Sequence, residues 1–191
     1  MDSEKKLTLT EEWLREHAVS YVSLARKEHF VGDCAMRCFD KMEIGTENGD
    51  ALPPFYKENT VTKTKYMLCA LLRLYLGIVD IQTVREDDPW MPTDEECDAY
   101  FASFPLSQLE RIKKTTQDRE LRDKIYDMLS DYRVLEKLLN AECYGLLPAM
   151  NDTISRFQMM MSAQTTPEAM EALMNATEEM KRELEELKAG K

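Results

Sequence analysis

Three side chains near the start of the chain, His29, Cys34 and Cys38, are of types that bind transition-metal ions. Their spacing is H-x4-C-x3-C, which puts the two cysteines one helical turn apart on the same face. A structural zinc site needs four ligands, typically supplied as two closely spaced pairs. Only Cys69 or Cys97 could complete such a set, and both are distant in sequence. We therefore expect the cysteines to be small buried core residues, and we keep a metal-binding regulator or small enzyme using these three residues as the alternative hypothesis.

A second group with potential chemistry is a cluster of carboxylates in the middle of the chain. Its members are Glu86, Asp87, Asp88, Asp94, Glu95, Glu96 and Asp98. The cluster lacks the ligand at every second position and the central glycine of a calcium-binding loop. Acidic residues are also favoured at a helix N-terminus, where they complement the helix dipole. The cluster is therefore interpreted as a solvated acidic face, with a docking site for a basic partner as the alternative, and no metal ligands are predicted.

Signatures of enzymes are absent from the sequence. The chain has only two histidines, His17 and His29, and neither lies in a helical metal-ligand motif such as H-E-x-x-H. There is no G-x-S-x-G sequence and no glycine-rich phosphate-binding loop. We predict a protein that is not an enzyme, with no catalytic residues and no cofactor.

Composition restricts the class of partner. The 191 residues carry a formal net charge of −11, whereas binding to a nucleic-acid backbone needs clustered lysine and arginine. An anionic membrane surface is disfavoured for the same reason. The first residues contain no apolar segment typical of a secretory signal, and the five cysteines are scattered, so we expect a reduced, cytoplasmic protein. The expected partners are other protein subunits, either copies of this chain or a different protein, with no nucleic acid, membrane or small-molecule substrate.

The elements that would position any site are predicted to be helices. The most apolar run of the chain, residues 62–84, leaves almost no polar face and is expected to be a central core helix. The charged Arg73 within it argues against a membrane span, and we expect it to pair with an acidic side chain from another helix. Low glycine and proline content and the lack of period-two alternation favour an all-α fold. The prediction is an irregular bundle of seven to eight helices around the central one.

Helix signals and breaks divide the rest of the chain. The pair Pro53-Pro54 predicts an irregular loop over residues 44–59, and Pro89 and Pro92 predict an extended connector. Gly145 and Pro148 predict the end of the longest helix. Besides the central run, helices are expected at residues 8–28, 34–42, 93–103, 107–114, 116–143, 151–164 and 167–188.

The last of these helices has the pattern of a coiled-coil seam. Met170, Leu173, Thr177, Met180, Leu184 and Leu187 are spaced three and four residues apart. We divide the chain into a globular domain, residues 1–164, and this amphipathic segment, residues 165–191. So narrow a seam needs a partner helix, which is either the preceding helix of the same chain or another subunit. The predicted partner interface is Met170, Leu173, Met180, Leu184 and Leu187.

Taken together, these features predict a non-enzymatic structural or interaction subunit of a larger assembly. A phage or viral component of the connector type is one concrete form, and an adaptor of a cellular complex is another. The sequence does not separate the two.

Overall fold

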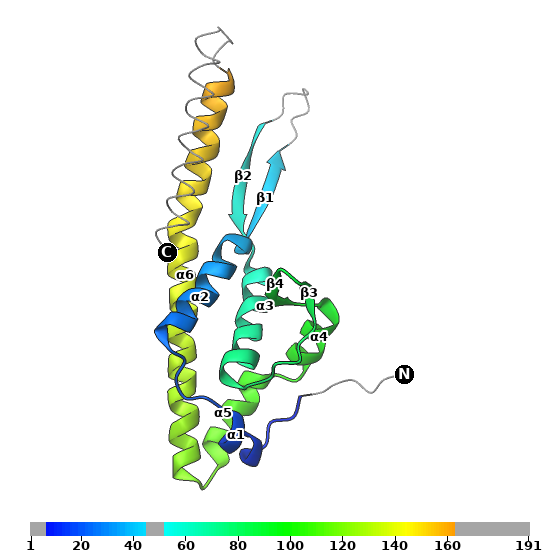
Figure 1. The fold of residues 1–191 in the computed structure, drawn as a ribbon, viewed down its shortest axis with the longest axis vertical. Helices are drawn as coiled ribbons and strands as arrows, with labels where there is room; N and C mark the ends of the chain where they lie inside the picture. The colour runs from blue at the N-terminus through cyan, green and yellow to red at the C-terminus, as the bar shows by residue number, and fades with distance from the viewer. Residues whose placement is uncertain (1–6, 45–51, 163–191) are drawn as a thin grey trace. The chain divides into compact units, whose positions relative to one another are not determined.

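The structure is a computed structural model that describes residues 7–44 and 52–162 (Figure 1). The chain forms two compact units. The first consists of the chain up to Asp40 together with Lys57–Leu146, and the second of Lys41–Tyr56 together with the chain from Leu147 onward. In chain order the elements are α1 (Glu11–His17), α2 (Leu24–Cys34), η1 (Ala35–Cys38), β1 (Phe39–Ile44), β2 (Leu52–Glu58), α3 (Thr60–Ala70), η2 (Leu71–Tyr75), β3 (Thr83–Arg85), β4 (Asp88–Pro92), α4 (Asp94–Ala102), α5 (Pro105–Thr115) and α6 (Arg119–Ser162).

The predicted all-α bundle of seven to eight helices is wrong. The described chain is mostly helical but contains two small two-stranded antiparallel sheets, β1–β2 and β3–β4, so the fold is α+β. Pro53-Pro54 lies in β2, and Pro89 and Pro92 lie in β4. Each strand of a two-stranded sheet has one unpaired edge, so a missing proline N–H need not interrupt the ladder. β3 and β4 are too short for an alternating pattern to be visible, and the longer β1 (FDKMEI) and β2 (LPPFYKE) do not alternate strictly between apolar and polar residues.

The central apolar run is helical for a shorter stretch than expected. The helix comprises α3 and the π-helical turn η2, and it ends at Tyr75 instead of continuing to residue 84. Gly77 has a φ of 66°, a left-handed conformation that favours glycine, and the N–H of Ile78 returns to the carbonyl of Leu72 (2.9 Å). The apolar residues beyond Gly77 continue the hydrophobic pattern but not the helix. α3 also contacts β4, as Figure 1 shows.

The N-terminal helices differ from the prediction in their boundaries. The single helix expected over residues 8–28 is divided, because α1 ends at His17 and α2 begins at Leu24. Thr10 caps α1, with its hydroxyl accepting from the N–H of Trp13 (3.2 Å), so the helix begins at Glu11 and not at residue 8. α2 continues through Gly32, and the helix expected over residues 34–42 is replaced by η1 and β1.

A buried ion pair joins three elements in the first unit. The Lys27 ammonium on α2 pairs with the Asp131 carboxylate on α6, and only 2 % of Lys27 is exposed. Asp131 Oδ2 also accepts from the Tyr75 hydroxyl (3.0 Å) and from the N–H of Val22 (3.0 Å). Buried charges are tolerated where they are paired and hydrogen-bonded in this way. The pair therefore fixes how α2 and η2 pack against α6.

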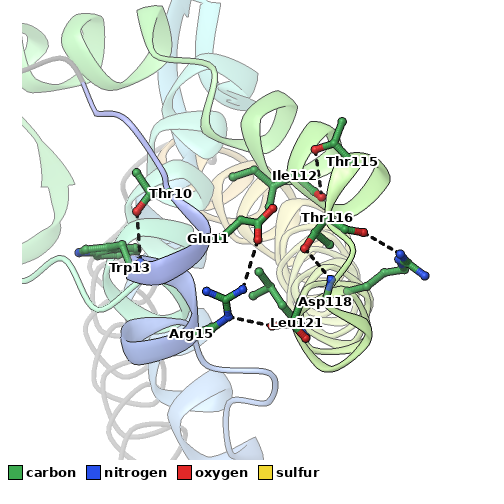
Figure 2. A network of polar contacts seen from close by, with 10 residues as sticks. Thr10, Glu11, Trp13, Arg15, Ile112, Thr115, Thr116, Asp118 and Leu121 are labelled. Carbon is green, nitrogen blue, oxygen red and sulfur yellow. Dashed lines mark hydrogen bonds and ion pairs between the residues drawn. The ribbon is translucent and has the colours of Figure 1, made fainter.

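A polar network joins α1, the end of α5 and the start of α6 (Figure 2). Asp118 caps α6, accepting from the N–H of Leu121 (3.1 Å), so the helix expected from residue 116 begins at Arg119. Asp118 Oδ2 also accepts from Arg15 Nε (2.8 Å), and Arg15 in turn pairs with Glu11 (3.2 Å). The hydrogen bond from Arg15, reinforced by the Leu121 N–H, holds the pKa of Asp118 below its usual value of 3.8.

We expect the variant Asp118→Asn to be less stable than the natural chain near neutral pH and nearly as stable in acid. A lowered folded-state pKa stabilises the protein above the unfolded-state value, and this contribution is lost as the pH falls through the folded-state value. Asparagine keeps the capping oxygen, so the substitution isolates the charge. Melting temperatures measured from pH 7 down to about pH 2 check this, since the folded-state pKa of Asp118 lies below its usual value of 3.8. A constant difference across the range would contradict it.

α6 is one continuous helix from Arg119 to Ser162, so the predicted end at Gly145 and Pro148 is wrong. Pro148 removes one helical N–H, which would bond to the carbonyl of Tyr144. Tyr144 is 85 % exposed, so water can reach this part of the helix. Water can therefore replace the lost hydrogen bond, and the helix continues past a residue that normally breaks it. None of the helices in the described ranges is long and apolar enough to cross a membrane.

In the second unit, the β1–β2 hairpin is held to α6 by one amide. Asn151 Oδ1 accepts from the N–H of Tyr56 (2.8 Å), and Asn151 Nδ2 donates to the carbonyl of Tyr56 (3.3 Å). The side chain thus satisfies both backbone groups of one strand residue. The hairpin replaces the irregular loop that was expected over residues 44–59.

Candidate protein-docking groove

The structure does not assemble His29, Cys34 and Cys38 into a metal site. The His29 side chain is 73 % exposed and pairs with Asp33 (2.9 Å), whereas both cysteines are buried. Across the described residues, no group of three or more histidine, cysteine, aspartate or glutamate side chains is placed to hold a metal ion.

The buried-core interpretation of the cysteines is confirmed. All five are buried and carry free thiols. Burial raises the pKa of Cys34 well above its usual range. Cys38 and Cys143 share a hydrogen bond, which raises the pKa of Cys38 and lowers that of Cys143. The thiols are therefore packed in the interior.

The acidic cluster is not uniformly a solvated face. Asp88 and Glu96 are buried, while the neighbouring Glu86 and Asp87 are exposed. Asp88 Oδ2 accepts from the Tyr66 hydroxyl (2.8 Å) and pairs with Arg37 (2.9 Å). Asp88 Oδ1 accepts from the backbone N–H of Trp90 (3.3 Å). Asp88 thus attaches the β3–β4 hairpin to α3 and η1, which is a structural role.

Arg73 does not meet the acidic partner that was expected. Its Nη2 donates to the backbone carbonyl of Ile81 (2.9 Å), and its Nε has no hydrogen-bond partner in the described part of the chain. Ile81 follows the end of the central helix, so Arg73 ties that helix to the chain leaving it. The predicted interface residues Met170, Leu173, Met180, Leu184 and Leu187 lie outside the described residues.

A groove of about 780 Å³ opens in the first unit between α3, the α4–α5 corner, α5 and α6. We call it the α5 groove. Four parts of the first unit line it. The wall from α3 and η2 consists of Lys63, Thr64, Met67, Leu68 and Leu71, and the α4–α5 corner contributes Phe101, Ala102, Phe104 and Pro105. The α5 wall consists of Leu106, Ser107 and Glu110, and the α6 wall of Leu129, Tyr132, Arg133, Glu136 and Asn140. A second hollow of about 500 Å³ shares Leu106, Ser107 and Glu110 and extends over the outer face of α5.

The lip of the groove carries large apolar side chains that remain in contact with solvent. Phe104 is 66 % exposed and Leu106 is 42 % exposed, and Phe101 on α4 is also exposed. α5 does bury another face, through Leu109 and Ile112. The exposed side chains are therefore an additional apolar surface, and such contiguous surfaces mark interaction sites.

The floor and corner of the groove are rigidly held. The buried Tyr132 donates its hydroxyl proton to the carbonyl of Met67 (3.2 Å), joining α6 to α3 across the floor. The Gln108 amide fastens the corner to the N-terminal segment: Oε1 accepts from the N–H of Leu9 (2.8 Å), and Nε2 donates to the carbonyls of Leu7 (2.8 Å) and Ser103 (2.5 Å). A pre-formed surface loses little conformational entropy on binding.

Phe104 is held in a left-handed backbone conformation, with φ 49° and ψ 57°. No other described residue except Gly77 has a positive φ. For a bulky residue this conformation is an outlier that costs on the order of 1–2 kcal/mol, and such strain concentrates at functional sites. The strain here holds an exposed aromatic ring at the lip of the groove.

We expect Phe104→Gly to leave the free energy of unfolding unchanged or to raise it by up to about 1 kcal/mol, because glycine adopts positive φ freely. Phe104→Ala removes the same ring but keeps the strain, so it serves as the matched control. Urea unfolding of both variants measures the difference. An alanine variant at least as stable as the glycine variant would contradict the account of strain.

The rim of the two hollows carries an excess of unpaired positive charge. Arg111, Lys114 and Arg133 make no ion pair with the residues that the structure describes, and Glu136 is the corresponding unpaired carboxylate. The other two charged lining residues are paired, Lys63 with Glu58 and Glu110 with Lys113 (2.6 Å), which is not itself a lining residue. The hydrogen bond from Lys113, with the nearby Lys114 and Arg133, holds the pKa of Glu110 below its usual range. This positive rim stands out on a chain with a net charge of −11.

Two features of the sequence correspond to the two sides of the groove. Phe101, Phe104 and Leu106 place three large apolar side chains around a helix break. On α6, Leu129, Tyr132, Arg133, Glu136 and Asn140 recur at helical spacing on one face. Neither pattern shows that the two faces meet, since this depends on how α5 packs beside α6.

Comparison of the chain with family models, with curated proteins and with solved structures gives no match.

Proposed function

We propose that the protein is a non-enzymatic interaction subunit of a larger protein assembly, and that the α5 groove receives an amphipathic helix with acidic flanks from a partner protein. One observation carries the proposal: the groove combines an exposed apolar lip with unpaired cations at its rim. Amphipathic helices bind such grooves through apolar side chains at positions i, i+3, i+4 and i+7.

The chemistry of the rim supports an acidic partner. The cations Arg111, Lys114 and Arg133 outnumber the unpaired Glu136. Charges at the rim of an interface raise the association rate and select the partner, while the apolar centre supplies most of the affinity. A helix with glutamates beside its apolar stripe can pack its apolar side chains against the lip and pair its glutamates with the cations of the rim.

Two synthetic helices of about 18 residues test this, because that length presents several turns to a groove. Both carry leucine at positions i, i+3, i+4 and i+7; the remaining positions hold glutamate and glutamine in one helix, and lysine and glutamine in the other. We expect the acidic helix to bind the full chain more tightly, with an affinity that falls as salt is added. Fluorescence anisotropy of the labelled helices measures both affinities.

Variants identify the surface that binds. Leu106→Asp should abolish binding of the acidic helix, because it places a carboxylate in the apolar lip. Arg133→Glu should weaken the acidic helix by about three- to tenfold and strengthen the basic one, given the usual energy of exposed charge pairs. Arg26→Glu makes the same charge change on an exposed face of α2 and serves as the control. Equal binding of the two helices, or binding unaffected by Leu106→Asp, would exclude the α5 groove as a site for acidic helices.

A further inference from the structure

We propose that the helix received by the α5 groove is residues 167–188 of a second copy of this chain, so that the protein self-associates by exchanging its C-terminal segments. This inference rests on the proposed helix-docking function and names its partner. Three arguments support it: the pattern of the segment, its charge, and the presence of both groove and segment in every copy of the chain.

The pattern of the segment matches the apolar requirement of the groove. The apolar positions Met170, Leu173, Met180, Leu184 and Leu187, with Thr177 between them, form a stripe three and four residues apart. The stripe is too narrow to be covered by the segment itself, so it needs an external surface. The lip formed by Phe101, Phe104 and Leu106 is such a surface and is exposed in the described structure.

The charge of the segment matches the rim. Residues 167–188 contain seven glutamates against three basic residues. The rim offers the unpaired cations Arg111, Lys114 and Arg133. Opposite charges at the rim of an apolar contact favour this pairing over a tail-to-tail coiled coil, in which the glutamates of two copies would repel each other.

Every copy of the chain carries both the α5 groove and the apolar segment, so two copies can each supply the surface that the other needs.

A reciprocal exchange closes the assembly. In a two-fold dimer each copy donates one segment and receives one, so the same contact is made twice. The closed dimer leaves neither groove nor segment unpaired. Two contacts contribute to its free energy of association, while the entropic cost of bringing two chains together is incurred once.

Sedimentation equilibrium of the full chain tests the proposal. We expect the natural chain to be a dimer. Leu106→Asp in the groove and Leu184→Asp in the segment should each raise the dimer dissociation constant by about a hundredfold or more, equivalent to the loss of about 2.7 kcal/mol. Arg133→Glu, an exposed change that leaves the fold intact, should weaken the dimer by a smaller factor. Ala172→Asp lies off the apolar stripe and serves as the matched control.

Mixing the two aspartate variants distinguishes this exchange from other dimers. The Leu106→Asp variant keeps an unaltered C-terminal segment, and the Leu184→Asp variant keeps an unaltered groove. The mixture should therefore form a heterodimer, in which the unaltered segment of one variant occupies the unaltered groove of the other. A dimer insensitive to Leu106→Asp would indicate a tail-to-tail coiled coil and overturn the proposal. A natural chain that stays monomeric overturns it too, but leaves the docking function standing if the acidic synthetic helix still binds. Failure of both measurements would overturn both proposals.

Discussion

Replacement of Lys27 by methionine should lower the free energy of unfolding by about 3–5 kcal/mol, because removing one partner of a buried ion pair leaves the other charge uncompensated. Lys27 is almost fully buried, and its ammonium pairs with Asp131. Methionine fills a similar volume, so the loss reports the charge and not a cavity. Urea unfolding followed by far-UV circular dichroism measures the change.

The partner of Lys27 provides the internal control. In the double variant Lys27→Met with Asp131→Asn, the amide oxygen can still accept from Tyr75 and Val22, but no unpaired charge remains. We expect this variant to recover a substantial part of the lost stability. Arg26→Met, on an exposed position of the same helix, should change stability by no more than about 0.5 kcal/mol. A double variant as unstable as Lys27→Met alone would show that the ion pair is not the cause.

Replacement of Asp88 by alanine should lower the free energy of unfolding by about 2–4 kcal/mol. The substitution removes the acceptor for Tyr66, whose hydroxyl lies in the interior, and also for the backbone of Trp90. Buried donors without an acceptor cost about 1–3 kcal/mol each, and the ion pair with Arg37 is lost as well. Trp90 packs edge-on against Phe30 (5.0 Å), so its fluorescence should report loosening of the hairpin.

A variant of the neighbouring Glu86 shows whether the loss of stability in Asp88→Ala comes from its lost hydrogen bonds or only from the change in net charge. Glu86 is exposed in the same turn, and Glu86→Ala should be nearly neutral. Asp88→Asn keeps one acceptor oxygen and should be intermediate. Equal effects of Glu86→Ala and Asp88→Ala would mean that only the net charge matters there.

The two buried carboxylates also explain how the α5 groove is positioned. Asp131 precedes Tyr132 on α6, and Tyr132 forms part of the groove floor. The contacts of Asp131 with Lys27 and Tyr75 fix the rotation of α6 about its axis in the first unit, because a rotation would break them. Asp88 holds β4 against α3, which forms the opposite wall. We therefore expect Lys27→Met to weaken binding at the groove as well as the fold.

Several features of this protein are determined by the sequence alone, because they depend on neighbouring residues. The capping residue Thr93 begins α4 where its spacing to Glu96 predicts, and its hydroxyl accepts from that N–H (3.3 Å). The helical period of Leu121, Ile125, Met128 and Leu135 places them in the core. The burial of the five cysteines likewise follows from their apolar character.

Other features are decided by contacts between distant residues, and the sequence patterns misjudge them. The apolar run after Gly77 predicts a helix because its hydrophobic residues are visible in the sequence, whereas the left-handed turn that stops the helix is not. α6 passes Pro148, where the exposed helix surface lets water replace the one lost hydrogen bond, and the strands are recognisable only through their partners.

The α5 groove belongs to this second group. Its apolar and charged residues come from segments up to 77 positions apart, between Lys63 and Asn140, and each segment by itself resembles an ordinary amphipathic helix. A helical pattern shows which side chains share a face, but the crossing of two helices decides whether those faces meet or leave a groove. The sequence therefore determined the helices and their core faces, and only the tertiary structure, through the buried pair of Lys27 and Asp131 and the strained corner at Phe104, decided where an apolar surface stays open to a partner.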